Sequence, residues 1–346
     1  MMYKKTKQKI KELMNEGIFS GVSFSFISED KSEDHTWGNA QILPTVEPLE
    51  RPLLFDVASL TKVICTTTVV LQLIETGVLK MDVPVHKYYP AIADQRLTIR
   101  HLLTHTSDIQ SYIENRDSLT KEALRLAYLQ VRSGENLGEK VAYTDTGTIL
   151  LGFMLEELFD NVLIEIFKER VLEPLDMTAS VFLPSNSSQI VPTENHPTRG
   201  VIRGQTHDPK AFVLAEHAGN AGLFTNLTDL KKFTEMYLND GKYMENRLLE
   251  KTTIELLLTD QTPNKRGQRS IGWDLKKDAT GHPLLFHTGY TGTFLLIDPI
   301  QKNAFIFLSN RIHPVDNRAQ YIEKRDELIQ LYLYEKRTNK DESLSF

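Results

Sequence analysis

Residues 55–62 read Phe55-Asp56-Val57-Ala58-Ser59-Leu60-Thr61-Lys62 and place a serine three residues before a lysine. If Ser59 opens a helix, both side chains lie on one helical face, because three residues make slightly less than one turn. A serine hydroxyl becomes a good nucleophile only when a neighbouring group takes its proton. The free N–H groups at a helix start also favour an oxyanion beside Ser59. The stretch therefore predicts a nucleophilic serine.

The residues that follow give this motif its context, because Ser-x-x-Lys taken alone is more often an N-cap serine followed by a surface lysine. The β-branched run of residues 66–70 would also fit a strand. The length of the apolar segment, and Gly77 as a stop, favour a buried helix instead. A lysine on the first turn of such a helix is drawn inward, and we expect desolvation to lower the pKa of Lys62.

Composition excludes several classes of protein. The chain has 346 residues, a net charge of −6 and scattered basic residues, which argues against a nucleic-acid partner. Cys65 is the sole cysteine, so no intramolecular disulfide forms. His101 and His105 have a spacing that a metal could use, but no third ligand suggests itself. We therefore expect no metal and no cofactor.

The start of the chain is basic but lacks the apolar segment of a signal peptide. No stretch of the sequence is long and apolar enough to span a membrane. The expected location is the cytoplasm, without a membrane span. Nothing in the sequence indicates an oligomeric state.

Hydrophobic patterning places strands at both ends of the chain and helices between them. The expected strands and terminal helices are residues 4–16, 21–28, 35–40, 270–275, 284–287, 292–298, 304–310 and 316–336. This predicts an α+β fold over a single domain, residues 1–346, whose antiparallel sheet is built from both termini and flanked by helices. The expected α/β subdomain comprises residues 1–65 and 267–346, and a mostly helical subdomain, residues 66–266, is inserted. A cleft between the two is a usual ligand site.

Two further stretches carry reactive groups. Tyr143-Thr144-Asp145 precedes an expected helix, and His287-Thr288-Gly289-Tyr290 ends an expected strand. Taken alone, these are a core tyrosine, a helix cap and a hairpin turn. Their order along the chain after Ser59 is what makes a shared site the better interpretation.

These three stretches together resemble the serine β-lactamase-like hydrolases of the class C β-lactamase, penicillin-binding protein and serine esterase type. Ser59-Leu60-Thr61-Lys62 resembles the Ser-x-x-Lys motif of that family, and Tyr143-Thr144-Asp145 resembles its Tyr-x-Asn motif. His287-Thr288-Gly289 resembles the Lys-Thr-Gly strand motif in its His variant. Residues 101–107 and 219–224 are similar to structural loops of the family, so the likeness covers nearly the whole chain.

The resemblance implies roles for these residues. Ser59 attacks a carbonyl and is acylated, Lys62 and Tyr143 share the proton transfers, and water releases the acyl group. The backbone N–H groups of Ser59 and Tyr290 form the oxyanion hole. Thr288, beside Gly289, bonds the substrate along the strand. Whether Lys62 or Tyr143 is the base stays open.

Two departures from the family pattern change the charge of the site. Asp145 replaces an amide by an acid, which stabilises the ammonium form of Lys62 and favours Tyr143 as the proton acceptor. His287 replaces a permanent cation by a group that is mostly neutral above a pKa of about 6.5. A site with His287 therefore lacks the permanent cation that would pair with the carboxylate of a β-lactam. Arg311 and Arg318 are candidates to replace that charge, or are plain surface arginines.

The expected function is that of a serine hydrolase acting through an acyl-enzyme on a small ester, amide or peptide. Peptidase or amidase and esterase activities stay open, with cell-wall-derived and D-amino acid compounds among the candidate substrates. The alternatives are a penicillin-binding or sensor-type protein that is acylated without efficient turnover, or a weak β-lactamase. His207 is expected first to order its loop and second to line the cleft.

Overall fold

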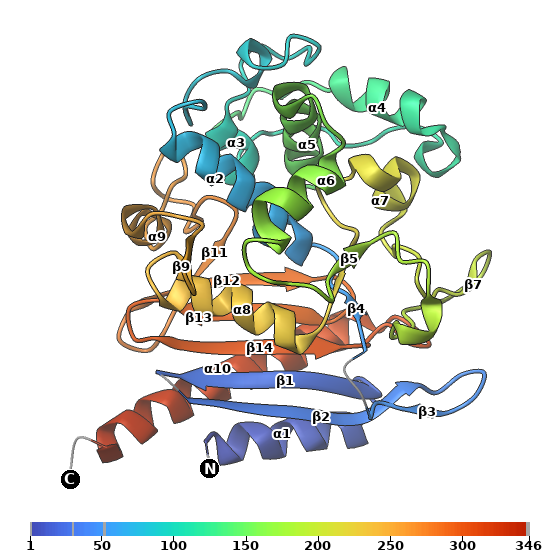
Figure 1. Cartoon of the computed structure of the whole chain (residues 1–346), viewed down its shortest axis with the longest axis vertical. Helices are drawn as coiled ribbons and strands as arrows, with labels where there is room; N and C mark the ends of the chain where they lie inside the picture. The colour runs from blue at the N-terminus through green and yellow to red at the C-terminus, as the bar shows by residue number, and fades with distance from the viewer. Residues whose placement is uncertain (1, 30, 51–52, 344–346) are drawn as a thin grey trace.

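A seven-stranded antiparallel sheet forms the base of the molecule (Figure 1). The structure is a computed structural model and describes residues 2–29, 31–50 and 53–343. The strands follow the order β11-β12-β13-β14-β1-β2-β3. Their bounds are Asp274–Lys277, Pro283–Gly289, Thr293–Asp298, Asn303–Ser309, Gly21–Ser28, Lys31–Gln41 and Glu47–Pro48. β1 pairs with β14, with Val22 opposite Ser309, so segments from both ends of the chain share one sheet, and the expected α+β fold is confirmed.

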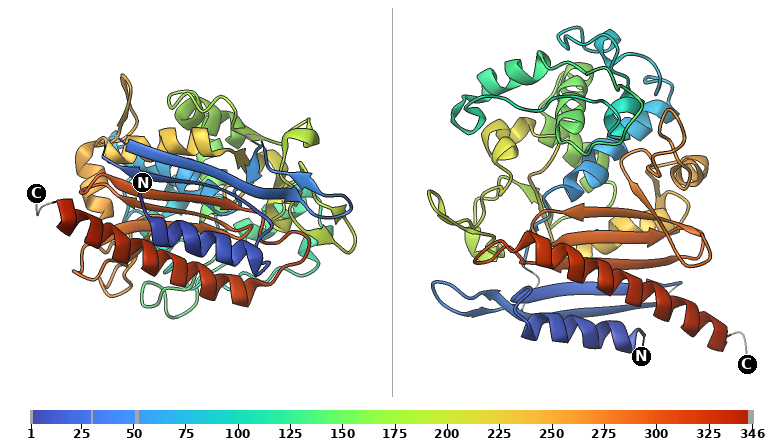
Figure 2. Two further views of the ribbon diagram at one scale, coloured as in Figure 1. Left: turned by 90° about the horizontal axis from the view of Figure 1, so that it is seen from below. Right: turned by 180° about the vertical axis from the view of Figure 1, so that it is seen from behind.

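Two helices, α1 (Lys4–Asn15) and α10 (Arg318–Ser343), lie side by side on one face of this sheet (Figure 2). Alternation along β1 turns Phe24 and Phe26 toward them, and a buried cluster of aromatic side chains fills the space between. The rings of Phe294 and Phe307 stack there with centroids 4.9 Å apart. This layer of helices buries one face of the sheet.

The opposite face carries α8 (Leu227–Leu238) and, beyond it, the mostly helical part of the chain (Figure 1). The other α-helices are α2 Thr67–Glu75, α3 Ile99–Leu103, α4 Lys121–Leu129, α5 Thr146–Phe159, α6 Leu163–Phe167, α7 Pro209–Leu214 and α9 Lys251–Leu257. α2 and α5 are apolar and almost wholly buried, which places the larger core here.

Short strands connect the two halves of the molecule. A three-stranded sheet has the order β4-β8-β5, with bounds Phe55–Asp56, Leu223–Thr225 and Val181–Phe182. Two hairpins, β6–β7 and β9–β10, span Asn195–His196 with Gly200–Val201 and Lys242–Tyr243 with Asn246–Arg247. Because β4 ends at Asp56, shortly before Ser59, this small sheet helps to fix where the serine lies.

Candidate active site

Ser59 lies in a tight turn between β4 and the helical segment that continues into α2. The expectation that Ser59 opens the helix is slightly off, because helical backbone begins at Leu60. Ala58 adopts a left-handed backbone with φ of 46°, a conformation that costs a non-glycine residue of order 1–3 kcal/mol. The Ala58 N–H donates to Oδ1 of Asp56 at 2.8 Å, which helps to hold this turn.

Lys62 begins a π-helical turn, Lys62–Thr66, and its side chain is buried against Ser59. Its Nζ lies 2.7 Å from Ser59 Oγ, 3.0 Å from the carbonyl oxygen of Asn220 and 2.7 Å from Asp145 Oδ1. Three acceptors around one Nζ match the three hydrogens of an ammonium group.

The pKa of Lys62 is raised, although burial by itself lowers it, because the charges of Asp145 and Tyr143 outweigh that burial. The expectation that desolvation lowers this pKa is therefore wrong. The expectation that Asp145 favours the ammonium form describes the site better. The same pairing acts on Asp145, whose pKa is lowered by Lys62 and Lys210 against the effect of burial.

Tyr143 covers this pair from the side of the cavity, and its side chain is 51% exposed. Lys62 Nζ lies 5.4 Å from the centre of the phenol ring, and the ring of His105 lies 4.4 Å from it. Among the described residues the Tyr143 hydroxyl has no hydrogen-bond partner. The phenol oxygen is therefore free to meet a ligand or the serine.

Two histidines behind Tyr143 are buried and neutral. Burial, together with the nearby cations Lys62 and Arg269, holds the pKa of His287 well below its usual value. The pKa of His105 is lowered by burial and by the same two cations. His287 thus adds no positive charge at pH 7. The guanidinium of Arg269 lies 5.8 Å from the Tyr143 ring, and its charge is paired with Asp274.

The turn after β12 is fastened to the backbone just before Ser59. Thr291 Oγ1 donates to the carbonyl of Asp56 at 2.6 Å. A Cβ on Gly289 would lie 2.3 Å from the carbonyl oxygen of Val57, so only glycine permits this close approach. Within the described residues, neither the Ser59 N–H nor the Tyr290 N–H donates a hydrogen bond. Two free donors therefore flank the serine turn.

The strand edge beside this turn is open. β11 pairs with β12 from Lys277 opposite Pro283 to Asp274 opposite Phe286, so His287, Thr288 and Gly289 extend beyond it. An extended segment of a ligand can add to such an edge through backbone hydrogen bonds. This is where the sequence expects Thr288 to meet the substrate.

Ser59, Tyr143 and Asp145 open into a cavity of about 740 Å³. Tyr290 and Arg318 line its other side, and the guanidinium of Arg318 lies 5.4 Å from the Tyr290 ring. Arg318 forms no ion pair among the described residues, so its charge faces the cavity without a partner.

Arg311 differs from Arg318, because it is buried and holds Asp316 and the carbonyl of Tyr290. His207 also belongs to the cavity wall. Its ring stacks on that of Tyr290 with centroids 5.6 Å apart, and its Nε2 lies 2.8 Å from Glu194. Both expected uses of His207, ordering the loop and lining the cleft, fit this position.

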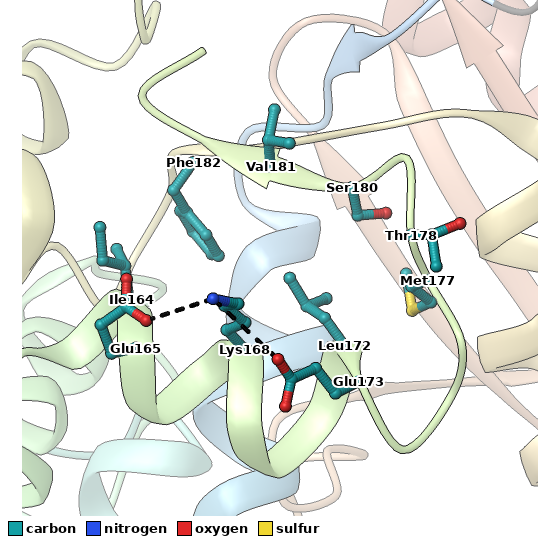
Figure 3. A pocket seen from close by; sticks show the side chains of 10 residues that line it. All are labelled: Ile164, Glu165, Lys168, Leu172, Glu173, Met177, Thr178, Ser180, Val181 and Phe182. Carbon is teal, nitrogen blue, oxygen red and sulfur yellow. Dashed lines mark ion pairs between the residues drawn. The ribbon is translucent and has the colours of Figure 1, made fainter. Parts of the chain in front are cut away.

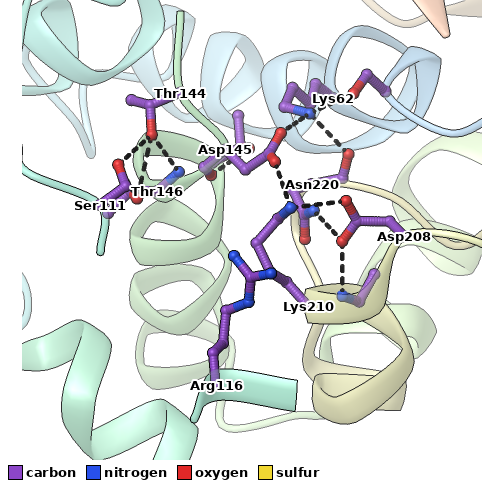
Figure 4. A network of polar contacts seen from close by, with 12 residues as sticks. Lys62, Ser111, Arg116, Thr144, Asp145, Thr146, Asp208, Lys210 and Asn220 are labelled. Carbon is purple, nitrogen blue, oxygen red and sulfur yellow. Dashed lines mark hydrogen bonds and ion pairs between the residues drawn. The ribbon is translucent and has the colours of Figure 1, made fainter. Parts of the chain in front are cut away.

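Sequence reasoning missed three charged groups of the site. Lys210 and Asp208 form ion pairs next to Asp145, as Figure 4 shows, and Arg269 lies behind Tyr143. Asp208 followed by proline is a signal for a helix start, and Asp208 is in fact the N-cap of α7. That signal could have placed Lys210 on the first turn of a helix, but not beside Asp145.

A second cavity, of about 410 Å³, lies between α6 and β5 and contains none of these residues (Figure 3). Its charged mouth is Lys168, at 3.6 Å from Glu165 and 4.0 Å from Glu173. Within the described part of the chain, no group of three or more His, Cys, Asp or Glu side chains is placed to hold a metal ion. None of the described helices is both long and apolar enough to cross a membrane.

Comparison with known proteins identifies a family for this chain. A model of the family described as Beta-lactamase matches residues 6–328. The chain belongs to the beta-lactamase family. It is a serine-type hydrolase of that family. The matched range includes the Ser59, Tyr143 and His287 motifs of this chain.

Individual relatives point to the same group. A protein of Escherichia coli (strain K12) with the provisional name D-alanyl-D-alanine carboxypeptidase is 29% identical over 331 residues, covering 80% of this chain and 75% of that protein. The Beta-Lactamase/D-Alanine Carboxypeptidase from Pseudomonas syringae has a TM-score of 0.73 at 17% identity and covers 95% of this chain and 97% of its own. The octameric penicillin-binding protein homologue from Pyrococcus abyssi has a TM-score of 0.73 at 22% identity, with 90% and 74% covered. These two solved structures share the beta-lactamase fold with this chain.

Proposed function

We propose that this chain is a serine hydrolase that forms an acyl-enzyme on Ser59 and cleaves a small ester or amide, with D-amino acid peptides as the favoured class. The observation that carries the proposal is the contact of 2.7 Å between Lys62 Nζ and Ser59 Oγ at the floor of an open cavity. An ammonium that donates to the serine oxygen orients the hydroxyl and stabilises negative charge that develops on it.

The proton of Ser59 then needs an acceptor other than Lys62. All three hydrogens of the Lys62 ammonium have acceptors, so Nζ offers no lone pair. Tyr143 is the proposed base: as a phenolate it takes the Ser59 proton and becomes a neutral phenol, and its ring faces the same ammonium at 5.4 Å. General-base assistance of this kind contributes typically about 10²–10⁴ in rate.

The proposed oxyanion hole consists of the unpaired N–H groups of Ser59 and Tyr290. Loss of one such donor typically costs about 10²–10³ in rate. Arg318 is proposed to bind a free carboxylate of the substrate, since it is a cation without an ion-pair partner on the Tyr290 side of the cavity. A peptide that ends in a D-amino acid supplies such a carboxylate, which agrees with the names of the curated relatives.

The test compares turnover of three compounds by the wild-type chain and by Ser59→Ala. The compounds are a D-alanyl-D-alanine peptide, p-nitrophenyl acetate and nitrocefin. We expect hydrolysis of the peptide or the ester that is lost in Ser59→Ala, and weaker action on nitrocefin. Equal rates in the two proteins would contradict the proposal. One stoichiometric burst without turnover would contradict the hydrolase and indicate a sensor-type protein that is acylated and does not release the acyl group.

Arg318→Gln tests the carboxylate site separately. We expect KM for the peptide to rise at least fivefold, while KM for p-nitrophenyl acetate, which has no carboxylate, changes less than twofold. Arg266→Gln, at an exposed position that does not line the cavity, is the matched control. A parallel change for both compounds would refute the assignment of Arg318.

A further inference from the structure

Asp145 holds two ammonium groups, one on each carboxylate oxygen. Oδ1 lies 2.7 Å from Lys62 Nζ, and Oδ2 lies 2.9 Å from Lys210 Nζ. Figure 4 shows the carboxylate between the two lysines, which come from different parts of the chain. The side chain of Asp145 is only 21% exposed, so water does little to neutralise it. Lys62 and Lys210 therefore both stabilise the negative charge of Asp145.

The contacts continue from Lys210 into a closed ring (Figure 4). Lys210 Nζ also lies 2.9 Å from Asp208 Oδ2, and Asn220 Nδ2 donates to Asp208 Oδ1 at 3.0 Å. The carbonyl oxygen of Asn220 accepts from Lys62 at 3.0 Å, which returns the ring to its start. The ring contains two positive and two negative side chains, so its charges balance.

Lys210 is fixed in this ring by its helix. It lies on the first turn of α7, whose N-cap, Asp208, accepts a hydrogen bond from the Ala211 N–H at 2.9 Å. The pKa of Lys210 is raised, because Asp208 and Asp145 outweigh the effect of burial. Lys210 therefore stays cationic and stays next to Oδ2 of Asp145.

Without Lys210, Oδ2 of Asp145 would be a half-buried charge with no partner, which is costly. Lys62 is the other cation in contact with Asp145, and a bidentate contact with both oxygens would draw its Nζ away from Ser59. We propose that Lys210 is a positioning residue: by occupying Oδ2 of Asp145, it leaves Lys62 directed at Ser59. This inference rests on the proposed function, because it concerns the same serine.

The test follows the rate at which Ser59 is labelled by a fluorophosphonate, a probe of the nucleophile that needs no knowledge of the natural substrate. We expect Lys210→Met to slow labelling at least tenfold. Lys210→Arg, which keeps the charge, should recover at least part of the loss. Lys121→Met removes a comparable ion pair, with Glu216 at 2.5 Å, outside the cavity and should leave the rate within twofold.

A double variant separates positioning from a merely structural role. Asp145→Asn/Lys210→Met has no acid that needs a second cation, so it should label at least threefold faster than Lys210→Met. If the losses in labelling rate of the Asp145→Asn and Lys210→Met single variants simply multiply in the double variant, the proposal is overturned. An effect of Lys210→Met on KM for p-nitrophenyl acetate with kcat unchanged would also overturn it, because Lys210 would then contact the substrate itself.

A crystal structure of Lys210→Met keeps the inference testable if the proposed hydrolase fails. The expected structure has Lys62 Nζ on both oxygens of Asp145 and beyond hydrogen-bond distance of Ser59 Oγ. An unchanged contact between Lys62 and Ser59 overturns the positioning role, whatever the chemistry of the site. Failure of wild-type Ser59 to take the label, in contrast, counts against the proposed function.

Discussion

At the scale of single residues, the charge of Lys62 is the decisive property. A buried lysine is expected to lose its proton unless counter-charges hold it. The sequence predicts that Lys62 turns inward, and it is indeed buried beside Ser59. The net direction of its pKa depends on Asp145, which lies far away along the chain. The inward position of Lys62 could therefore be predicted from the sequence. The direction of its pKa could not, because it depends on contacts that exist only in the folded chain.

Tyr143→Phe should slow acylation by p-nitrophenyl acetate about 10²–10⁴-fold, because it removes the proposed base and leaves the Lys62 contact intact. The measurement is the burst rate constant by stopped flow. Tyr112→Phe, which alters a tyrosine that is 85% exposed and does not line the cavity, should have no effect. A Tyr143→Phe rate within twofold of wild type would assign the base to another group.

His287→Gln should change the pH dependence of stability. In the unfolded chain the histidine binds a proton below about pH 6.5. In the folded chain its pKa is well below that value, because burial, Lys62 and Arg269 disfavour the charge. The unfolded state therefore binds more protons as pH falls, so stability is complete above pH 6.5 and declines below it by about 1.4 kcal/mol per pH unit for one such group.

Urea unfolding at pH 7.5, 6.5 and 5.5 measures this effect. We expect the wild-type free energy of unfolding to fall more steeply below pH 6.5 than that of His287→Gln. Above pH 7 the two curves should run in parallel, which serves as an internal control. Identical slopes at acidic pH would mean that His287 titrates normally in the folded protein.

At the scale of elements, the site depends on how β12 and its turn are attached to the Ser59 turn. Hydrophobic alternation predicted the strands around residues 284–287, 292–298 and 304–310, close to the observed bounds. The first strand of that group was expected at residues 270–275 but is β11, Asp274–Lys277. The later start of β11 leaves residues 287–289 without a β11 partner, although they pair with β13 on their other side. Strand propensity cannot show this, because register is a property of two strands.

Thr291→Val should lower kcat for ester hydrolysis about tenfold or more with little change in KM. The hydroxyl of Thr291 holds the turn to the Asp56 carbonyl at 2.6 Å, so its loss loosens the proposed oxyanion donor at Tyr290. Thr76→Val removes a similar hydroxyl-to-carbonyl bond, to Gln72 at 3.0 Å, outside the cavity. Equal effects of the two substitutions would show that the turn does not act through the site.

At the scale of the whole molecule, the two terminal helices seal the sheet on which the site is built. The start of α1 has no side-chain N-cap of its own. The carboxylate of Glu335 in α10 takes the place of an N-cap: it accepts hydrogen bonds from the Lys5 N–H at 2.8 Å and the Thr6 N–H at 2.7 Å. The sequence predicted both helices and the α+β layering. It could not predict that an acid near one end of the chain caps a helix at the other.

Glu335→Ala should lower the free energy of unfolding by about 1–3 kcal/mol, because it leaves buried N–H donors without a partner. Denaturant unfolding measures the change. The kcat and KM for p-nitrophenyl acetate should stay within twofold, since Glu335 does not line the cavity. A loss of activity with unchanged stability would contradict the view that Glu335 stabilises the fold without acting in catalysis.

The central claim is that separate segments of the chain make the Ser59 hydroxyl reactive. Its most direct test is intact mass and peptide mapping after brief exposure to a fluorophosphonate, with wild type, Ser59→Ala and Lys62→Met in parallel. We expect one adduct per wild-type chain, on the peptide that contains Ser59, no adduct in Ser59→Ala and strongly slowed labelling in Lys62→Met. An adduct on another residue, or equal labelling of all three proteins, would contradict it.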